Sequence, residues 1–139
     1  MRIIIINGPN LNLVGKREPE LYGDKSMDTY MEELKKEYDQ VDIEYYQSNI
    51  EGELINKLQE VGFDYDGILF NAGGYTHTSV AIADAIAAIR TPVVEVHITD
   101  PKKREDFRHV SLIESNCVAT VSGLGLESYK RALQTFLSE

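Results

Sequence analysis

Basic residues, cysteine and long apolar runs are all scarce in this chain. Its 139 residues include 14 lysines and arginines against 23 aspartates and glutamates, which gives a net charge of -9. This balance excludes a general nucleic-acid binder, because phosphate neutralisation requires a basic surface. Any anionic ligand must therefore be met by a few local positive side chains.

The single cysteine, Cys117, cannot form an internal disulfide, which favours a reducing compartment. The longest strongly apolar runs, residues 3–6 and 80–89, fall short of the roughly 20 residues that cross a bilayer. Nothing at the N-terminus reads as a secretory signal. We therefore expect a soluble cytoplasmic protein in which Cys117 is a small buried residue rather than a nucleophile.

Strand-like and helix-like segments alternate from end to end, which predicts an α/β fold with a parallel sheet and helices on both faces. The sheet has a short edge strand second in sequence, which favours the flavodoxin-like order 2-1-3-4-5. We expect one domain over residues 1–139. The predicted strands are residues 3–6, 41–45, 67–70, 92–97 and 118–121, and the predicted helices are residues 27–38 behind an N-cap at Ser26, 53–61, 80–89 and 126–137.

The predicted helix at residues 80–89 is apolar nearly all round. One of its flanks must be buried by something besides its own sheet, so we expect a homo-oligomer. Asp84 interrupts this apolar helix. The pattern leaves two positions open for it, one reaching into a partner's site and one facing solvent.

Polar side chains follow the predicted strands at the edge where open parallel sheets bind ligands. Asn10 follows the first strand, Asn71 and His77 follow the third, and Glu95 and His97 end the fourth. Glu95 and His97 are two residues apart and share a face, so the carboxylate is placed to orient and charge the imidazole. A structural ion pair at a strand end is the alternative. No cluster of cysteine or histidine predicts a metal site.

The connection after the first strand is long for a βα loop and has glycines at Gly15 and Gly23, a pattern typical of a lid. Within it, Arg17 lies five residues before Tyr22. A cation beside a phenol favours the phenolate, which makes Tyr22 a candidate general base. Without the rest of the sequence, an exposed solvated loop is the simpler interpretation.

Residues 102–109 are mixed in charge and predict a mostly solvated helix. Arg104 and Arg108 would be neighbours one turn apart, so at least one of them is placed to turn toward the strand ends. Gly123 and Gly125 fit a tight turn into the last helix, because the dinucleotide-binding fingerprint is incomplete there.

Several multi-residue motifs occur in order along essentially the whole chain. They are Asn7-Gly8-Pro9-Asn10-Leu11-Asn12-Leu13, Arg17-Glu18-Pro19 with Tyr22-Gly23, Gln47-Ser48-Asn49 with Glu51-Gly52, Asn71-Ala72-Gly73-Gly74-Tyr75-Thr76-His77-Thr78-Ser79, Glu95-Val96-His97, and Arg104-Glu105-Asp106-Phe107-Arg108. Together they resemble type II 3-dehydroquinate dehydratase.

The resemblance implies a flavodoxin-like fold, a dodecamer built from trimers, and no cofactor. It implies a hydro-lyase that converts 3-dehydroquinate to 3-dehydroshikimate by anti elimination of water through an enolate. Such an enzyme serves the shikimate pathway of aromatic amino acid biosynthesis or quinate catabolism. A non-catalytic flavodoxin-like scaffold that binds a small acid is the alternative.

The same resemblance gives each site residue a role. Tyr22 would remove the proton next to the ketone, with Arg17 stabilising its phenolate, while Asn10 would help to hold the enolate oxygen through a water. His97 would protonate the departing hydroxyl while Glu95 orients it. The residues implied to bind substrate are Asn71 with the backbone around Ile98 and Thr99, for the carboxylate, and His77, Arg108 and Asp84 of the partner subunit, for the ring hydroxyls.

Two positions next to the implied carboxylate site depart from the commoner family pattern. Thr99 replaces serine and keeps a hydroxyl, whereas Asp100 stands where asparagine is usual. A carboxylate beside the substrate carboxylate would weaken binding unless it points away.

Overall fold

A computed structural model describes residues 1–16 and 18–137, with the backbone alone at Tyr22. In this part of the chain, parallel strands form one five-stranded sheet in the order β2-β1-β3-β4-β5, so the predicted strand order is confirmed. The strands are β1 (Arg2–Asn7), β2 (Asp42–Gln47), β3 (Gly67–Asn71), β4 (Val93–His97) and β5 (Ala119–Ser122).

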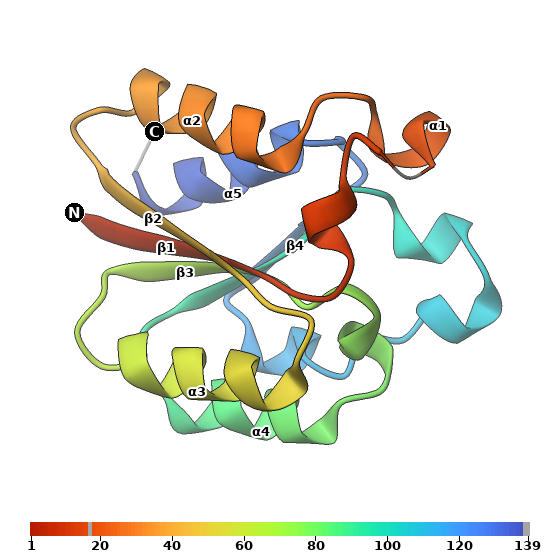
Figure 1. Cartoon of the computed structure of the whole chain (residues 1–139). Helices are drawn as coiled ribbons and strands as arrows, with labels where there is room; N and C mark the ends of the chain where they lie inside the picture. The colour runs from red at the N-terminus through yellow and green to blue at the C-terminus, as the bar shows by residue number, and fades with distance from the viewer. Residues whose placement is uncertain (17, 138–139) are drawn as a thin grey trace.

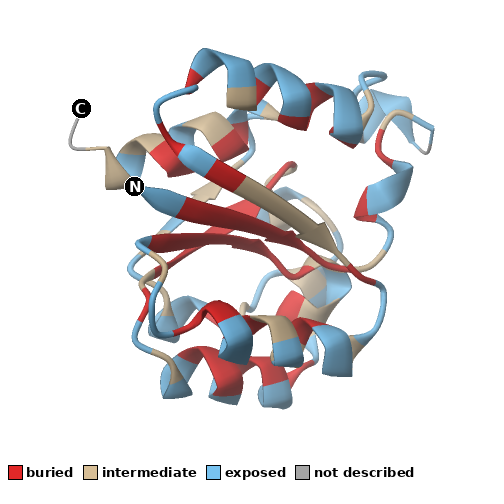
Figure 2. Ribbon diagram, turned by 60° about the vertical axis from the view of Figure 1, so that its left-hand side comes forward, coloured by how far each residue is buried: buried red, intermediate tan, exposed pale blue. Residues whose placement is uncertain are grey.

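Helices cover both faces of the sheet (Figure 1), with α2 (Met27–Glu37) and α5 (Glu127–Phe136) on one face and α3 (Glu51–Val61) and α4 (Val80–Ala88) on the other. The alternation of side chains along a strand divides the core accordingly. In β1, Ile3 and Ile5 pack with α2 and α5, whereas Ile4 and Ile6 pack with α3 and α4. Figure 2 shows the buried residues concentrated in the strands between the two helix layers. Within the described residues, no helix is both long and apolar enough to cross a membrane.

Serine side chains cap two of the helices. Ser26 begins α2, as predicted, by accepting a hydrogen bond from the Thr29 N–H at 3.1 Å. Ser79 begins α4 by accepting from the Ile82 N–H at 2.9 Å, and its hydroxyl also donates to Glu51 at 2.5 Å. The Ser79–Glu51 hydrogen bond therefore connects the start of α4 to the start of α3, near the carboxyl end of β3.

One flank of α4 is not covered by the sheet of its own chain. Ile82 and Ile86 are buried, but Val80 is 63% exposed and Asp84 is exposed on the outer side of the helix. The helix is thus apolar beyond what its own chain buries, as the sequence indicated.

The prediction of a continuous helix over residues 102–109 is wrong. The chain instead makes two 3₁₀ turns, η3 (Pro101–Lys103) and η4 (Asp106–Arg108). The Asp100 carboxylate accepts from the Lys102 N–H at 3.0 Å and starts the first turn, and the extended backbone of Arg104 ends it. The loop after β1 also holds a short helix, α1 (Pro19–Tyr22), that the sequence pattern did not predict.

Candidate active site

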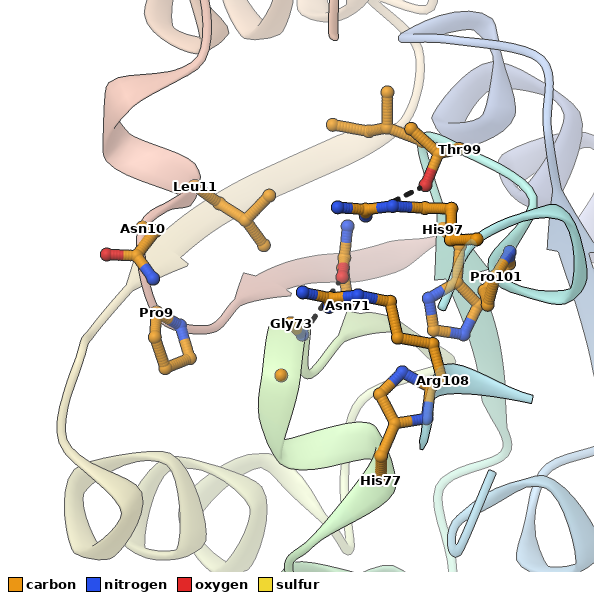
Figure 3. Close-up of a pocket in the computed structure, with 13 residues that line it drawn as sticks. Pro9, Asn10, Leu11, Asn71, Gly73, His77, His97, Thr99, Pro101 and Arg108 are labelled. Carbon is orange, nitrogen blue, oxygen red and sulfur yellow. Dashed lines mark hydrogen bonds between the residues drawn. The ribbon is translucent and has the colours of Figure 1, made fainter. Parts of the chain in front are cut away.

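A cavity of about 150 Å³ opens at the carboxyl ends of β1, β3 and β4, where ligands bind in open parallel sheets. Figure 3 shows its side chains converging from the turn after β1, from η2 (Gly73–His77), from the end of β4 and from the 3₁₀ turns that follow. The lining residues among those described are Pro9, Asn10, Leu11, Asn71, Gly73, Gly74, His77, His97, Ile98, Thr99, Pro101, Arg104 and Arg108.

Positive side chains line the cavity although the chain as a whole is acidic. None of its described lining residues is acidic, and both Arg104 and Arg108 line it. Arg104 donates from Nη1 to the Thr99 hydroxyl at 3.3 Å, and Arg108 donates from Nε to Glu105 at 2.9 Å. The sequence led us to expect at least one of these arginines here, and the fold supplies both. They are local positive groups of the kind that an anionic ligand requires in a protein of net charge -9.

Glu95 and His97 form a buried hydrogen-bonded pair at the end of β4. His97 Nε2 lies 2.5 Å from Glu95 Oε2, and the two residues are 8% and 1% exposed. Glu95 also accepts from the Ser111 hydroxyl at 2.8 Å and from the Thr120 hydroxyl at 3.3 Å. The carboxylate is therefore held from three directions, and its orientation fixes that of the imidazole.

These contacts decide the charge of Glu95. Burial by itself raises the pKa of a carboxyl, but the hydrogen bonds and charge of His97, with the hydroxyls of Ser111 and Thr120, outweigh it and lower the pKa of Glu95 below its ordinary value. An ionised Glu95 accepts a hydrogen bond from His97 Nε2 and so fixes the orientation of the ring. With Nε2 engaged by the carboxylate, Nδ1 is the nitrogen that remains for a ligand.

Ser111 was not singled out from the sequence. Its hydroxyl accepts from the N–H groups of Ile113 at 3.3 Å and Glu114 at 3.2 Å, in a local turn just before η5 (Glu114–Asn116), while it donates to Glu95. Serine favours such side-chain turns, which is the only local signal at this position. Its contact with Glu95, 16 residues away in sequence, cannot be predicted from any local sequence pattern.

Asn71 and His77 stand at the two ends of the segment after β3. Asn71 is 3% exposed, and its side-chain oxygen accepts from the Gly73 N–H at 3.1 Å. His77 Nδ1 lies 2.8 Å from the Val110 carbonyl oxygen. A carbonyl only accepts, so Nδ1 carries the hydrogen and His77 turns Nε2 to other partners.

The position of Asn10 depends on the end of the neighbouring strand β2. Its backbone is left-handed, with φ of 71°, and its N–H donates to the Asn49 side-chain oxygen at 3.0 Å. Gln47 donates to the same oxygen at 3.1 Å and to the Gly8 carbonyl at 3.1 Å. These contacts explain why the Asn7-to-Leu13 and Gln47-to-Asn49 motifs occur together, since the second fixes the turn made by the first.

Comparison with known proteins identifies the family. A model of the family described as "Dehydroquinase class II" matches residues 1–137. The chain belongs to this family. Proteins named 3-dehydroquinate dehydratase from Exiguobacterium sp. strain AT1b and from Halothermothrix orenii are 49% and 47% identical to it, over 99% of this chain and 94% of theirs. A crystal structure of type II dehydroquinase from Butyrivibrio crossotus superimposes with a TM-score of 0.95 at 40% identity, covering 99% of this chain and 97% of the other.

Arg17 and Tyr22 both match the dehydroquinase motifs. Arg17 lies outside the described part of the structure, and so does the side chain of Tyr22. The backbone of Tyr22 ends α1. Leu21, Gly23 and Lys25 line a different cavity, beside the start of α5. No described side chain of residues 18–25 lines the cavity at the strand ends.

Two acidic residues of interest stay outside this cavity in the single dehydroquinase chain. Asp84 is exposed on α4, so the chain by itself does not bring it to the site, and both positions considered for it stay open. Asp100 turns its carboxylate back onto the Lys102 N–H and is absent from the described lining residues. Its carboxylate is therefore engaged by its own backbone turn, although Asp100 lines a neighbouring cavity that shares His97 and Arg108.

Cys117 is half-buried rather than fully buried, and it packs against the core on the α3 and α4 face. Burial, followed by the charges of Glu95 and Glu114, raises the pKa of its thiol to about 12. A thiol of this kind is a poor nucleophile at neutral pH. Among the described residues, no group of three or more histidine, cysteine, aspartate or glutamate side chains forms a metal site.

Proposed function

We propose that this cavity dehydrates 3-dehydroquinate to 3-dehydroshikimate by anti elimination through an enolate, with residues 1–139 acting as one catalytic domain. One observation carries the proposal. The buried His97–Glu95 pair opens into a cavity that two arginines line and no described carboxylate lines, in a chain that belongs to the dehydroquinase family. The substrate is a small hydroxylated carboxylic acid, which requires both an anion site and a proton donor.

His97 is the acid of the proposed reaction. In its protonated form it gives a proton to the departing hydroxyl, which leaves as water when the C–O bond breaks. The neutral imidazole that results still donates through Nε2 to Glu95, at the 2.5 Å contact seen here. Because Glu95 is ionised, it accepts this hydrogen bond and fixes the ring throughout the step.

The substrate carboxylate is assigned to Asn71 together with the backbone around Ile98 and Thr99. All three residues line the cavity, and Asn71 is fixed by its contact with Gly73. His77 and Arg108 line the same cavity from η2 and η4 and are assigned to the ring hydroxyls. Asp84 of the partner subunit would complete this set.

The loop after β1 supplies the base in this proposal. Tyr22, as phenolate stabilised by Arg17, takes the proton next to the ketone, and the electron pair passes to the carbonyl oxygen as an enolate. Asn10, which lines the cavity, holds that oxygen through a water. Base and acid thus come from different elements, as an elimination from opposite sides of a ring requires. No metal, cofactor or imine takes part.

A cytoplasmic homo-oligomer, a dodecamer built from trimers, is part of the same proposal. It is supported by the exposed apolar flank of α4, where Val80 is 63% exposed and Asp84 projects. Light scattering tests it directly. A fully active species of 15.7 kDa would contradict both the interface and the shared role of Asp84.

Ultraviolet absorbance tests the reaction itself. Dehydration creates a carbon–carbon double bond conjugated with the ketone, so absorbance grows when the protein is mixed with 3-dehydroquinate. A scaffold that only binds the acid would leave the absorbance flat and would overturn the proposal. The same assay after treatment with a chelator, and after borohydride with substrate, should show full activity, because the mechanism uses neither a metal nor an imine.

A further inference from the structure

Beneath the cavity lies a buried polar chain that the proposed mechanism does not use. At its centre is the hydroxyl of Tyr129, a residue of α5 that is 0% exposed and does not itself line the cavity. This hydroxyl accepts from Asn71 Nδ2 at 3.0 Å and donates to Asn7 Oδ1 at 2.8 Å. Asn7 Nδ2 in turn donates to the Tyr45 hydroxyl at 3.3 Å. The chain joins α5 with the ends of β3, β1 and β2.

The direction of every hydrogen bond in this chain follows from one backbone group. The Gly73 N–H only donates, so the atom of the Asn71 amide that faces it, at 3.1 Å, must be the oxygen. The amide nitrogen of Asn71 therefore faces Tyr129. Because the Tyr129 hydroxyl accepts this bond, its own proton is free to go to the oxygen of Asn7.

Tyr129 keeps that hydroxyl proton. Complete burial raises the pKa of the phenol well above its ordinary value, more than its bonds to Asn71 and Asn7 lower it. The Tyr129 hydroxyl is thus a fixed partner for both asparagines rather than a group that titrates. Through Tyr129, helix α5 therefore fixes Asn7 and Asn71, which are the last residues of the neighbouring strands β1 and β3.

The consequence for the cavity concerns the second hydrogen of Asn71 Nδ2. One hydrogen of this nitrogen is used by Tyr129, and among the described residues the other has no partner. Asn71 lines the cavity. With its oxygen held by Gly73 and its nitrogen held by Tyr129, the Asn71 amide presents one N–H donor to an anion without rotating. Without the Tyr129 hydroxyl, only Gly73 would hold it.

We propose that Tyr129 is a positioning residue for carboxylate recognition, which holds the Asn71 amide as a preset donor in the cavity. The inference rests on the proposed role of Asn71 in binding the substrate carboxylate. Tyr129 is separate from the acid pair. Glu95 pairs with Phe70 in the sheet and lies on the face covered by α3 and α4, whereas Tyr129 packs with Leu69 and Val96 on the opposite face.

This separation predicts that Tyr129 affects binding far more than chemistry. In Tyr129→Phe, we expect KM for 3-dehydroquinate to rise about tenfold, the cost of one buried hydrogen bond, with kcat changed less than about twofold. Calorimetry with quinate, the alcohol analogue of the substrate, should show the same fold loss of affinity. Tyr30→Phe is the matched control, because Tyr30 is 4% exposed, packs against Tyr129 with ring centroids 6.4 Å apart, and its hydroxyl makes no bond to Asn7 or Asn71. It should leave KM unchanged.

A double-mutant cycle separates positioning from general structural damage. In an Asn71→Ala background, Tyr129→Phe should leave KM where Asn71→Ala already set it, because the amide that Tyr129 holds is gone. An unchanged KM in Tyr129→Phe alone, or an equal rise in KM in both backgrounds, would overturn the inference. Wild-type protein without dehydratase activity would instead contradict the proposed function.

A second variant keeps the test available if Tyr129→Phe does not fold. Asn7→Leu, which has nearly the same shape, removes the acceptor of the Tyr129 proton while leaving Tyr129 and Asn71 in place. We expect KM to rise in the same direction, by a smaller factor than the loss of the hydroxyl itself. A folded Asn7→Leu variant with wild-type KM and wild-type affinity for quinate would count against the polar chain.

Discussion

The cavity at the strand ends and the loop after β1 are built in different ways. On the side of β3 and β4, Asn71, Glu95 and His97 are at most 8% exposed, and each is held by hydrogen bonds to groups elsewhere in the fold. In the loop after β1, every residue from Glu18 to Lys25 whose exposure is described is exposed, and none of their described side chains lines the cavity. Glu18 there also has a left-handed backbone, with φ of 40°.

This difference separates the site residues that the fold already holds in place from those that must be placed when a ligand binds. The proposed acid and the proposed carboxylate site are held by the sheet, so substitutions there should disturb both stability and activity. The proposed base belongs to a segment whose described residues bury little, so substitutions there should disturb activity alone. Each of the following experiments tests that contrast.

The largest effect is expected on the loop side. Tyr22→Phe should lower kcat by about 10³-fold, because it removes the proposed general base, and Arg17→Ala should act in the same direction. The free energy of unfolding should stay within about 0.5 kcal/mol of wild type, because the described neighbours of Tyr22 in this loop are exposed and add little to the core. Steady-state kinetics and urea unfolding measure the two quantities. Tyr38→Phe, at the residue that follows α2 and is absent from the described lining of the cavity, is the control for turnover. Near-normal turnover in Tyr22→Phe would move the base elsewhere.

On the strand side, His97→Ala should lower kcat by about 10²-fold, since the hydroxyl must then leave without its proton donor. Unlike Tyr22→Phe, this variant should also lose stability, because Glu95 keeps a buried charge without its partner. Parallel measurements of kcat and urea unfolding compare the two. If His97→Ala is as stable as wild type, the contrast between the two sides fails.

The His97–Glu95 pair should also make the stability of the protein depend on pH. The pKa of Glu95 in the folded protein is below its ordinary value of 4.5, so the ionised carboxylate stabilises the fold above about that pH, and this contribution is lost as the pH falls through the folded-state pKa. Glu95→Gln should therefore cost about 1–3 kcal/mol of unfolding free energy at neutral pH and progressively less in acid. Urea titrations across this range measure it. Glu114→Gln, a nearby exposed residue, is the control, and a cost for Glu95→Gln that does not shrink in acid would be evidence against an ionised Glu95.

The smallest effect is expected for proteolysis of the loop. Lys16 is exposed, so trypsin should cleave after it, and saturating quinate should slow this cleavage by less than about tenfold if the loop closes over the ligand. Mass spectrometry of timed digests measures the rate. Cleavage after exposed Lys36, on α2, serves as the internal reference. An unchanged rate at Lys16 would leave Tyr22 without the water-excluded setting that its role requires.

The sequence predicted much of the fold because its signals are local. The isoleucines of residues 3–6 indicate a strand covered on both faces, and Ser26 caps the helix that it was expected to cap. The spacing of Glu95 and His97 predicted their contact, since residues two apart on a strand share a face. The motif resemblance predicted the family that the comparisons show.

The sequence pattern led to a wrong prediction at the place where a single turn sets the path of the backbone. Residues 102–109 have a helical charge pattern, but the Asp100 carboxylate caps a 3₁₀ turn and the extended backbone at Arg104 ends it. That change of path carries both Arg104 and Arg108 to the cavity, which a periodicity argument cannot foresee. It also turns the Asp100 carboxylate back to the Lys102 N–H.

By itself, the sequence determined the strands, the four longer helices, the order of the sheet and the residues that stand at the strand ends, because hydrophobic periodicity and capping act over a few residues. Only the tertiary structure decided which distant groups meet. Tyr129 bonds to Asn7 across 122 positions, and Ser111 reaches Glu95 across 16. Such contacts depend on how the chain packs against the sheet, and no local sequence pattern predicts which group a buried hydroxyl will bond to.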